Sequence, residues 1–358
     1  MNIDETSSER LAILRFPLIV GVVFIHAYGS QVIFTGTQSG SNTTGIISFY
    51  VQSIISQGVA RLSVPLFFLI SGYFFFLGLN WSLNCYKKQI NKRLSSLFVP
   101  FLIWNTITLL AFIVIQELPL TASLLSGEKD NILSFGILDF FDAIIGITKS
   151  PISYQFWFIR DLIVICIFSP ILYFLVRKMK YVAVMLFVIL WFIECWPLYV
   201  PSIASVLFFS LGAAFSINNC SLFKLDKLGK IAIFVYLLIL PADVFSKKLW
   251  FNGYIHKFGI LVGLIAILYL SGCLQKNEKL KKSLLYLSPS SFFVFAFHEP
   301  ILMASKKISY KLFNPTSDLE IILIFLLCPT LIILLSVIIY SLMKIKFPKI
   351  TSVICGGR

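Results

Sequence analysis

LEIILIFLLCPTLIILLSVIIYSLM, at residues 319–343, holds a single charged side chain, Glu320. The run exceeds the about 20 predominantly apolar residues that a helix needs to cross a bilayer. The same template finds nine further runs, although 181–196 and 202–217 are short. We therefore expect ten membrane spans, at 11–28, 59–79, 97–116, 156–176, 181–196, 202–217, 230–246, 254–273, 284–303 and 319–343.

The composition of the whole chain agrees with this interpretation. Of its 358 residues 58% are hydrophobic and only 13% are charged, 36 are phenylalanine, and the mean hydropathy is +0.91. Average soluble domains are less apolar and about 25% charged. These values exclude soluble single-domain enzymes, disordered chains and disulfide scaffolds. The seven cysteines form no CxxC pair, so neither a zinc site nor a disulfide framework is expected.

The sequence thus predicts an all-α, polytopic transmembrane helical bundle. We expect residues 1–358 to form a single integral membrane domain without an appended soluble domain. MNIDETSSER, at residues 1–10, carries no basic region and no cleavage site of a signal peptide, so the first span is interpreted as a retained helix. Two interrupted apolar segments, 46–56 and 132–147, are candidates for re-entrant or interfacial pieces.

The basic residues predict the orientation. With the N-terminus inside, nineteen of the 30 Lys and Arg residues fall on the cytoplasmic side and eight in outer loops. This bias is the positive-inside pattern, and it places both termini in the cytoplasm. The net charge of +14 is then mostly a topology signal, and no nucleic-acid partner is expected.

A few ionisable residues lie inside predicted spans, where an unpaired charge costs several kcal/mol. Arg15 and His26, eleven residues apart, face the same side of one helix, with Arg15 near the cytoplasmic end. The others are predicted to lie in the outer half of the membrane: Arg61, Arg160, Asp161, His298 and Glu299.

Each of these residues also has an ordinary interpretation. Arg15 suits a snorkelling anchor, His26 a polar helix contact, and Trp157 an aromatic-belt anchor. Arg160 and Asp161 suit an interfacial pair, although adjacent residues on a helix do not face each other. As a set they suit acyl transfer, with an imidazole as general base and an arginine at the oxyanion. They also suit a proton relay in a transporter.

Five collinear motifs carry a family resemblance over nearly the whole chain. The spacing Arg15–x10–His26, in LRFPLIVGVVFIHAYG, resembles the first-helix motif of the membrane acyltransferase-3 family. RLSVPLFFLISGYFF from Arg61 is similar to that family's RxxVPxFFxxSGY segment. Three later segments resemble its remaining blocks: LFVPFLIW at 97–104, FWFIRDLIVICIFSPILYFL at 156–175, and FFVFAFHEPIL at 292–302.

The resemblance implies a multi-pass O-acyltransferase of the bacterial inner membrane. Its donor would be an acyl-CoA, with acetyl-CoA expected, and its acceptor a hydroxyl of an envelope or extracellular polysaccharide, lipopolysaccharide or glycolipid. No bound cofactor or metal is expected. Direct transfer and an acyl-histidine intermediate are both open, as are acetyl and succinyl groups. By position, His26, Arg15 and His298 are the catalytic candidates, and the substrate-binding candidates are Arg61, Ser71, Tyr73, Trp157, Arg160, Asp161 and Glu299.

The competing interpretations are a transporter or flippase of a lipid-linked glycan, a glycan polymerase and an inert membrane scaffold. A flippase should show polar residues along several helices or repeat symmetry, whereas the interior charges here are sparse. A polymerase should show a long arginine-rich outer loop, whereas the predicted outer loops 29–58 and 117–155 carry only Lys129 and Lys149 as basic residues.

Overall fold

A computed structural model describes residues 5–30, 32–34, 37–39, 45–78, 81–118 and 131–357. Within these ranges the chain is helical apart from one antiparallel pair of short strands, β1 (Val32–Phe34) and β2 (Thr37–Ser39). The chain divides into two compact units. Unit 1 takes Met1–Val22, Gly58–Phe98 and Phe158–Ser291, and unit 2 takes Val23–Gln57, Val99–Trp157 and Phe292–Arg358.

Unit 1 contains the first part of α1 (Glu5–Ala27), which continues into unit 2. Its further elements are η2 (Val59–Leu62), α3 (Ser63–Phe76), α4 (Leu83–Arg93), η3 (Leu94–Phe98), α8 (Trp157–Ile167), α9 (Ser169–Met179), α10 (Tyr181–Phe192), α11 (Ile203–Ile217), η6 (Leu222–Leu228), α12 (Gly229–Phe245), α13 (Asn252–Gln275), α14 (Glu278–Leu287) and η7 (Ser288–Ser290).

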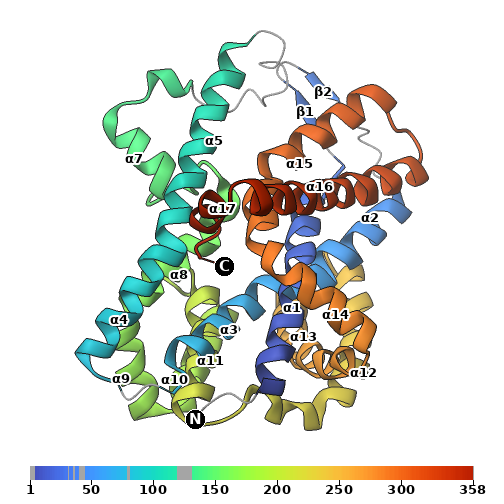
Figure 1. Ribbon diagram of the computed structural model, residues 1–358. Helices are drawn as coiled ribbons and strands as arrows, with labels where there is room; N and C mark the ends of the chain where they lie inside the picture. The colour runs from blue at the N-terminus through green and yellow to red at the C-terminus, as the bar shows by residue number, and fades with distance from the viewer. Residues whose placement is uncertain are drawn as a thin grey trace. The chain divides into compact units, whose positions relative to one another are not determined.

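Helices α3 and α11 lie side by side in the core of unit 1 (Figure 1). Their backbones approach closely because each presents a glycine to the other. A Cβ atom on Gly72 would lie 2.0 Å from the Phe209 carbonyl oxygen, and one on Gly212 would lie 1.9 Å from the Leu69 carbonyl oxygen. Small residues permit such contacts in membrane proteins, where van der Waals packing drives helix association. Gly72 of the SGY motif therefore has a packing role.

Gly212→Ala is expected to lower the melting temperature of the detergent-solubilised protein clearly. Its methyl group would meet backbone atoms, which must move apart, and overpacking of this kind costs about 1–3 kcal/mol. Gly253→Ala on α13 is the matched control, because nothing lies within 4 Å of the added Cβ. Equal melting temperatures for the two variants would contradict the close α3–α11 contact.

Arg10 connects α1 to α13 and η6 inside unit 1. Its guanidinium pairs with both Asp226 carboxylate oxygens, at 2.7 and 3.1 Å. It also donates to the Leu268 carbonyl and the Ser271 hydroxyl, and it stacks 3.7 Å from the centre of the Phe223 ring. Arg10 is one of the nineteen basic residues that the sequence places on the cytoplasmic side of the membrane, but its side chain is buried. Arg10 is therefore a structural residue.

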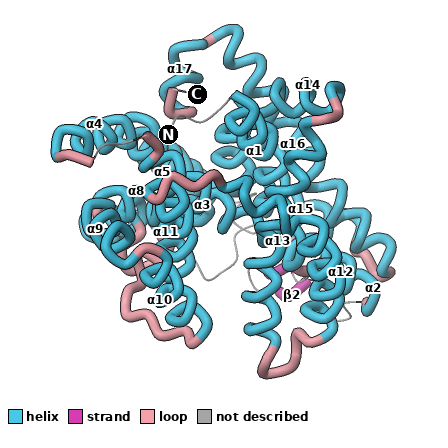
Figure 2. The backbone as a smooth tube through the Cα atoms, turned by 90° about the horizontal axis from the view of Figure 1, so that it is seen from below, coloured by secondary structure: helices cyan, strands magenta, loops and turns pink. Residues whose placement is uncertain are grey.

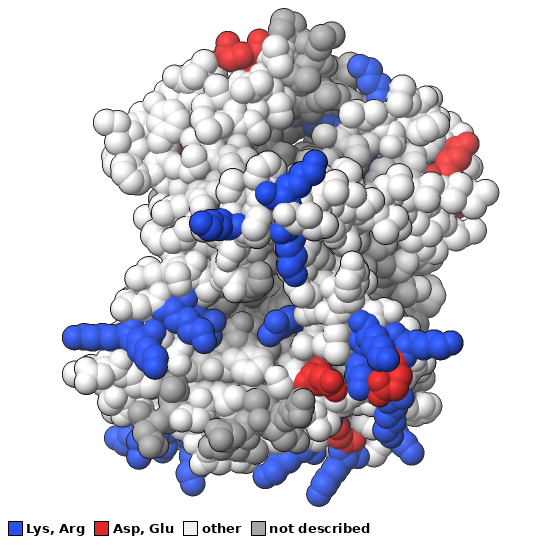
Figure 3. All heavy atoms as spheres, in the orientation of Figure 1, with Lys and Arg blue, Asp and Glu red and all other residues white. Residues whose placement is uncertain are grey.

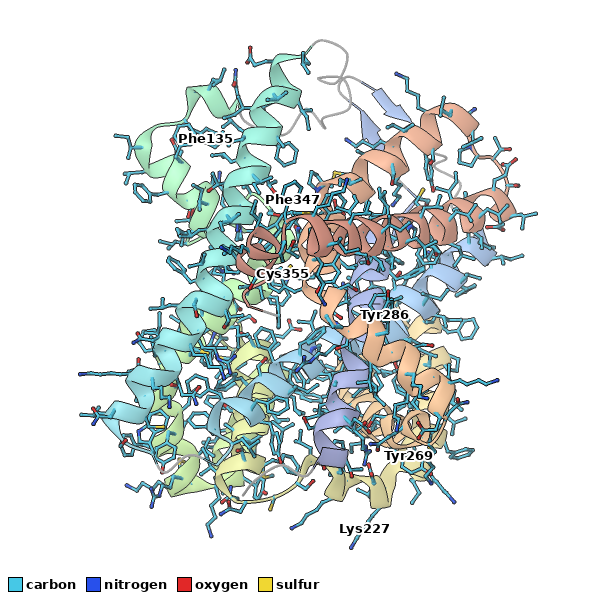
Figure 4. All side chains as sticks on the ribbon, in the orientation of Figure 1. Phe135, Lys227, Tyr269, Tyr286, Phe347 and Cys355 are labelled. Atoms are coloured by element: carbon cyan, nitrogen blue, oxygen red, sulfur yellow. The ribbon has the colours of Figure 1, made fainter. Side chains whose placement is uncertain are left out.

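Basic side chains gather at one end of unit 1, whereas the predicted cytoplasmic lysines Lys344, Lys346 and Lys349 belong to unit 2. Figure 3 shows the Lys and Arg side chains concentrated over the lower part of the visible face, where Figure 1 places α4 and the beginning of α1. Lys227 points away from the helices at this end (Figure 4). From here α12 and α13 run side by side (Figure 2). The pattern suits a positive-inside end, and the orientation of the chain stays a prediction.

Unit 2 contains the end of α1 and the hairpin β1–β2. Its other elements are α2 (Ile46–Gln52), η1 (Ser53–Gly58), α5 (Val99–Glu117), η4 (Ile132–Ser134), α7 (Ile137–Ile145), η5 (Tyr154–Phe156), α15 (Ser291–Phe313), α16 (Asp318–Lys346) and α17 (Pro348–Ile354). Leu109 and Phe112 of α5 pack with Ile132, and Phe135 lies between α7 and α5 (Figure 4). The other side of α7 exposes Ile137, Leu138 and Phe141, and a re-entrant or interfacial position of segment 132–147 stays a prediction.

Each predicted span corresponds to a helix or a pair of helices. Six described segments are long and apolar enough to cross a membrane, namely Thr6–Ala27, Ile46–Phe76, Leu83–Glu117, Leu222–Phe245, Asn252–Gln275 and Asp318–Lys346. A seventh is formed if Tyr154–Ile167 and Ser169–Met179, bent by 68°, count as one. A helical protein with several membrane-crossing segments is thus confirmed, and the number ten stays a prediction.

The three remaining predicted spans, 181–196, 202–217 and 284–303, do not form single helices long enough to cross a membrane. Helices α10 and α11, at 181–196 and 202–217, are apolar but short. The ninth run, 284–303, is divided between α14 and α15, and α15 is broken at Glu299 (φ −111°, ψ 140°). Pro300 explains this break, because a residue before proline is pushed from helical to extended backbone. The interrupted segment 46–56 joins the second span instead of standing alone.

Candidate active site

Two histidines from opposite ends of the chain meet in unit 2. His26 lies in the last turn of α1, and its ring centre is 5.2 Å from that of His298 on α15. The Tyr154 ring stands edge-on to His26, with ring centres 4.9 Å apart. Two of the three predicted catalytic residues thus lie in one cluster, to which the structure adds a tyrosine.

The break in α15 supplies polar backbone groups next to these rings. Pro300 has no N–H, so the Ala296 carbonyl loses its helical partner. The Gln155 amide replaces that partner, because its Nε2 donates to the carbonyls of Ala296 at 3.3 Å and of Glu299 at 3.4 Å. A broken helix is tolerated at membrane depth only where such partners are present. Gln155 therefore stabilises the conformation that presents His298 and Glu299.

His298 is fully buried and its tautomer follows from its contacts. Its Nδ1 lies 2.7 Å from the Phe295 carbonyl oxygen and 3.2 Å from that of Val294. A carbonyl only accepts, so Nδ1 carries the proton and Nε2 carries a lone pair. Within the described ranges no hydrogen bond reaches this Nε2. Buried polar atoms rarely lack a hydrogen-bond partner, so this Nε2 is an unusual feature of the cluster.

Tyr154 connects His26 to Glu299. The Tyr154 hydroxyl donates to Glu299 Oε1 at 3.0 Å, while its ring contacts His26. Helix α5 holds this segment in place: the Ser153 N–H donates to Asn105 Oδ1 at 3.2 Å, and the Ser153 and Thr108 hydroxyls lie 3.3 Å apart. A carboxylate, a phenol and two imidazoles thus lie within one cluster, which we call the histidine cluster: His26, Tyr154, His298 and Glu299.

The predicted site residues are divided between the two units. His26, Trp157, His298 and Glu299 belong to unit 2, with Trp157 at the first position of α8. The remaining six belong to unit 1. There Arg61 is exposed on η2, Ser71 is half-buried on α3, and Tyr73 is buried beside α11.

Arg160 and Asp161 form a buried ion pair despite being neighbours on α8. The long arginine side chain folds back, so that its Nη2 lies 3.1 Å from Asp161 Oδ1. The other carboxylate oxygen accepts from the Ser202 N–H at 2.8 Å and from the Ser205 hydroxyl at 3.0 Å. Asp161 thereby stabilises the first turn of α11, where negative charge is favoured by the helix dipole. These contacts give Asp161 a structural role. A contact between Asp161 and the substrate stays a prediction.

Arg15 differs from Arg10 although both lie on α1. The Arg15 side chain is exposed, and no hydrogen bond or ion pair to it is found among the residues that the structure describes. An exposed guanidinium with its donors free is suited to an anion, above all a phosphate. The structure therefore leaves Arg15 available for the predicted donor.

Sequence reasoning missed Tyr154, Gln155 and Lys306. Lys306 is one of the eight basic residues that the sequence places in outer loops, whereas its side chain extends from helix α15 to the end of α1. For Gln155 a signal was present: Pro300 inside an apolar run leaves a carbonyl that needs a donor, and Gln155 is polar among apolar neighbours. The described residues contain no group of three or more His, Cys, Asp or Glu side chains placed to hold a metal.

Comparison with known proteins covers nearly the whole chain. Residues 9–341 match a family described as an acyltransferase domain, acyltransferase-3. Over 367 aligned residues the chain is 24% identical to "Succinoglycan biosynthesis protein ExoH" of Rhizobium meliloti (strain 1021). That alignment covers 99% of this chain and 94% of the relative. No solved structure matches the chain.

Proposed function

The chain belongs to the acyltransferase-3 family and is an acyltransferase, and from this premise we propose that it is a membrane O-acyltransferase of the bacterial inner membrane. We propose that it moves an acyl group, acetyl first of all, from acyl-CoA to a hydroxyl of an envelope or extracellular polysaccharide or glycolipid. The name of the Rhizobium relative, a succinoglycan biosynthesis protein, supports a polysaccharide acceptor.

The observation that carries the proposal is the contact between His26 and His298 inside the histidine cluster. An O-acyltransferase needs a base for the acceptor hydroxyl, and imidazole is the side chain best suited to that task. The Phe295 carbonyl fixes the tautomer of His298, which leaves a lone pair on Nε2, and the centres of the His298 and His26 rings are 5.2 Å apart. The cluster thus brings two imidazoles together, and one of them, His298, carries a lone pair on Nε2.

The reaction that we propose is a direct transfer. His26 takes the proton of the acceptor hydroxyl, and the hydroxyl oxygen attacks the thioester carbonyl carbon. A carbon–oxygen bond forms, the carbon–sulfur bond breaks, and coenzyme A leaves as its thiol once the proton has been returned to sulfur. The products are the acyl ester and free coenzyme A. Arg15 contributes by binding the donor phosphates, for which its exposed guanidinium is suited.

The test is a transfer assay with purified protein in liposomes. Labelled acetyl-CoA and the polysaccharide from a strain that lacks the protein are supplied together. We expect alkali-labile label on the polysaccharide and release of free coenzyme A in equal amounts. If a lipid-linked glycan instead crosses the bilayer without acyl-CoA, the protein is a flippase. If acyl-CoA stays intact with every envelope glycan of that strain, the protein is a scaffold.

The same assay separates direct transfer from a covalent intermediate. Incubation with labelled donor and no acceptor should leave the protein unlabelled. Label recovered on a peptide that contains His26 would overturn direct transfer, while the acyltransferase assignment would stand.

A further inference from the structure

We infer that Lys306 is a positioning residue that fixes His26 through the end of helix α1; this inference rests on the proposed role of His26. The Lys306 ammonium donates to the carbonyls of Ala27 at 3.2 Å and of Tyr28 at 3.3 Å, and it also contacts the carbonyl of Gly29. These are the residues that directly follow His26.

The Lys306 ammonium supplies hydrogen-bond donors and positive charge to the C-terminal end of helix α1. The last carbonyls of α1 have no intrahelical partner and carry the negative end of the helix dipole. An ammonium group has three donors and a positive charge, so it fits three converging carbonyls. The carbonyls converge because the chain turns at Gly29, whose φ of 95° favours glycine.

Two further contacts hold the same turn from the other side. The Gly29 N–H donates to Gln52 Oε1 at 2.9 Å, and the Ser56 hydroxyl donates to the Phe24 carbonyl at 2.6 Å. These two polar residues come from α2 and η1. Polar groups from α2, η1 and α15 thus all bind the end of α1, and Lys306 is the charged one among them.

Lys306 also belongs to the helix that carries the rest of the histidine cluster. It lies on α15, beyond the break at Glu299. Glu299 accepts from Tyr154, and the Tyr154 ring contacts His26. Helix α15 thus carries both Lys306, which binds the end of α1, and Glu299, which binds Tyr154 beside His26. Removal of Lys306 deletes the charged contact between α15 and the end of α1.

The expected effect is on catalysis more than on donor binding. A displacement of about 1 Å at a catalytic group can cost 10²-fold in rate. Lys306→Met, which keeps an unbranched side chain one atom shorter and removes the charge and donors, should lower kcat about 100-fold and leave KM for acyl-CoA within about twofold. Lys306→Arg keeps charge and donors, so it should recover at least about a tenth of the wild-type kcat.

Lys311→Met is the matched control, because Lys311 is exposed in the last turn of the same helix. It should behave like the wild type. All rates are expressed per folded molecule, from size-exclusion chromatography and a melting curve. Where Lys306→Met yields too little folded protein, Lys306→Gln takes its place, because it removes the charge and keeps a donor.

The inference is overturned if Lys306→Met has the wild-type kcat per folded molecule, or if Lys306→Arg is no better than Lys306→Met. His26→Ala is assayed in parallel. Activity retained in His26→Ala overturns the proposed role of His26 itself. An inactive His26→Ala together with a fully active Lys306→Met overturns only the inference about Lys306.

Discussion

His26→Ala should lower the rate of acyl transfer by about 10²–10⁴-fold, the range that a positioned general base contributes. The substitution removes the imidazole that contacts His298 and Tyr154, so that no base remains at the end of α1. His26 is only half-buried, and we therefore expect the amount and melting temperature of the protein to change little. The measurement is transfer of label from acetyl-CoA to polysaccharide, with protein quantified in the membrane.

The third histidine of the chain provides a control. His256 lies in the first part of α13 in unit 1, where its Nδ1 is 2.8 Å from Asp243 Oδ2 on α12. Asn252 also donates to Asp243 at 2.8 Å, so Asp243 keeps a contact when His256 is replaced. His256→Gln should transfer acyl groups at the wild-type rate. Normal polysaccharide acylation by His26→Ala, with normal protein in the membrane, would refute the catalytic assignment.

Arg15→Gln should raise KM for acyl-CoA by about 10–100-fold. The guanidinium is exposed and has no partner among the described residues, so its proposed partner is a donor phosphate. Hydrogen bonds to charged groups contribute about 1.5–3 kcal/mol, and each 1.4 kcal/mol corresponds to a factor of about ten. The melting temperature should not fall, because no described contact within the protein is lost. Initial rates over a range of acyl-CoA concentrations give KM.

Arg10→Gln is the matched comparison on the same helix. Arg10 is buried and bound to Asp226, Leu268 and Ser271, and breaking a buried pair costs about 3–5 kcal/mol. Arg10→Gln should therefore reduce the amount of folded protein and leave KM of the surviving molecules unchanged. If Arg15→Gln instead lowers the protein level and leaves KM unchanged, Arg15 is a membrane anchor.

Much of the helical architecture was predictable because its cause is local. A run such as 319–343 is a membrane span by the transfer free energy of its own side chains, and α16 covers that run. The template of about 20 apolar residues fails to predict a helix correctly where a single residue interrupts the helical backbone. Pro300 divides the predicted span 284–303, since a proline interrupts a helix whatever the hydropathy of its neighbours.

The candidate site was predictable in its histidines and less so in its supporting residues. His26 and His298 were identified as candidates because an ionisable side chain inside an apolar span costs free energy and is therefore usually functional. Asp161 stood out equally, yet it binds the beginning of α11 and Arg160. The free-energy cost of burying an ionisable group marks candidate catalytic residues such as His26 and structural residues such as Asp161 alike. It does not distinguish them, because the partner of each residue comes from another segment of the chain.

The sequence by itself determined the membrane class, the helical segments, the family and the residues whose charge is misplaced in a bilayer. Each of these depends on the side chains of one segment at a time. Only the tertiary structure decided which polar groups meet: Arg10 with Asp226, Gln155 with the broken helix α15, and Lys306 with the end of α1. The physical reason is that hydrogen bonds and ion pairs act over about 3 Å, and only the packing of distant segments brings such partners within that reach.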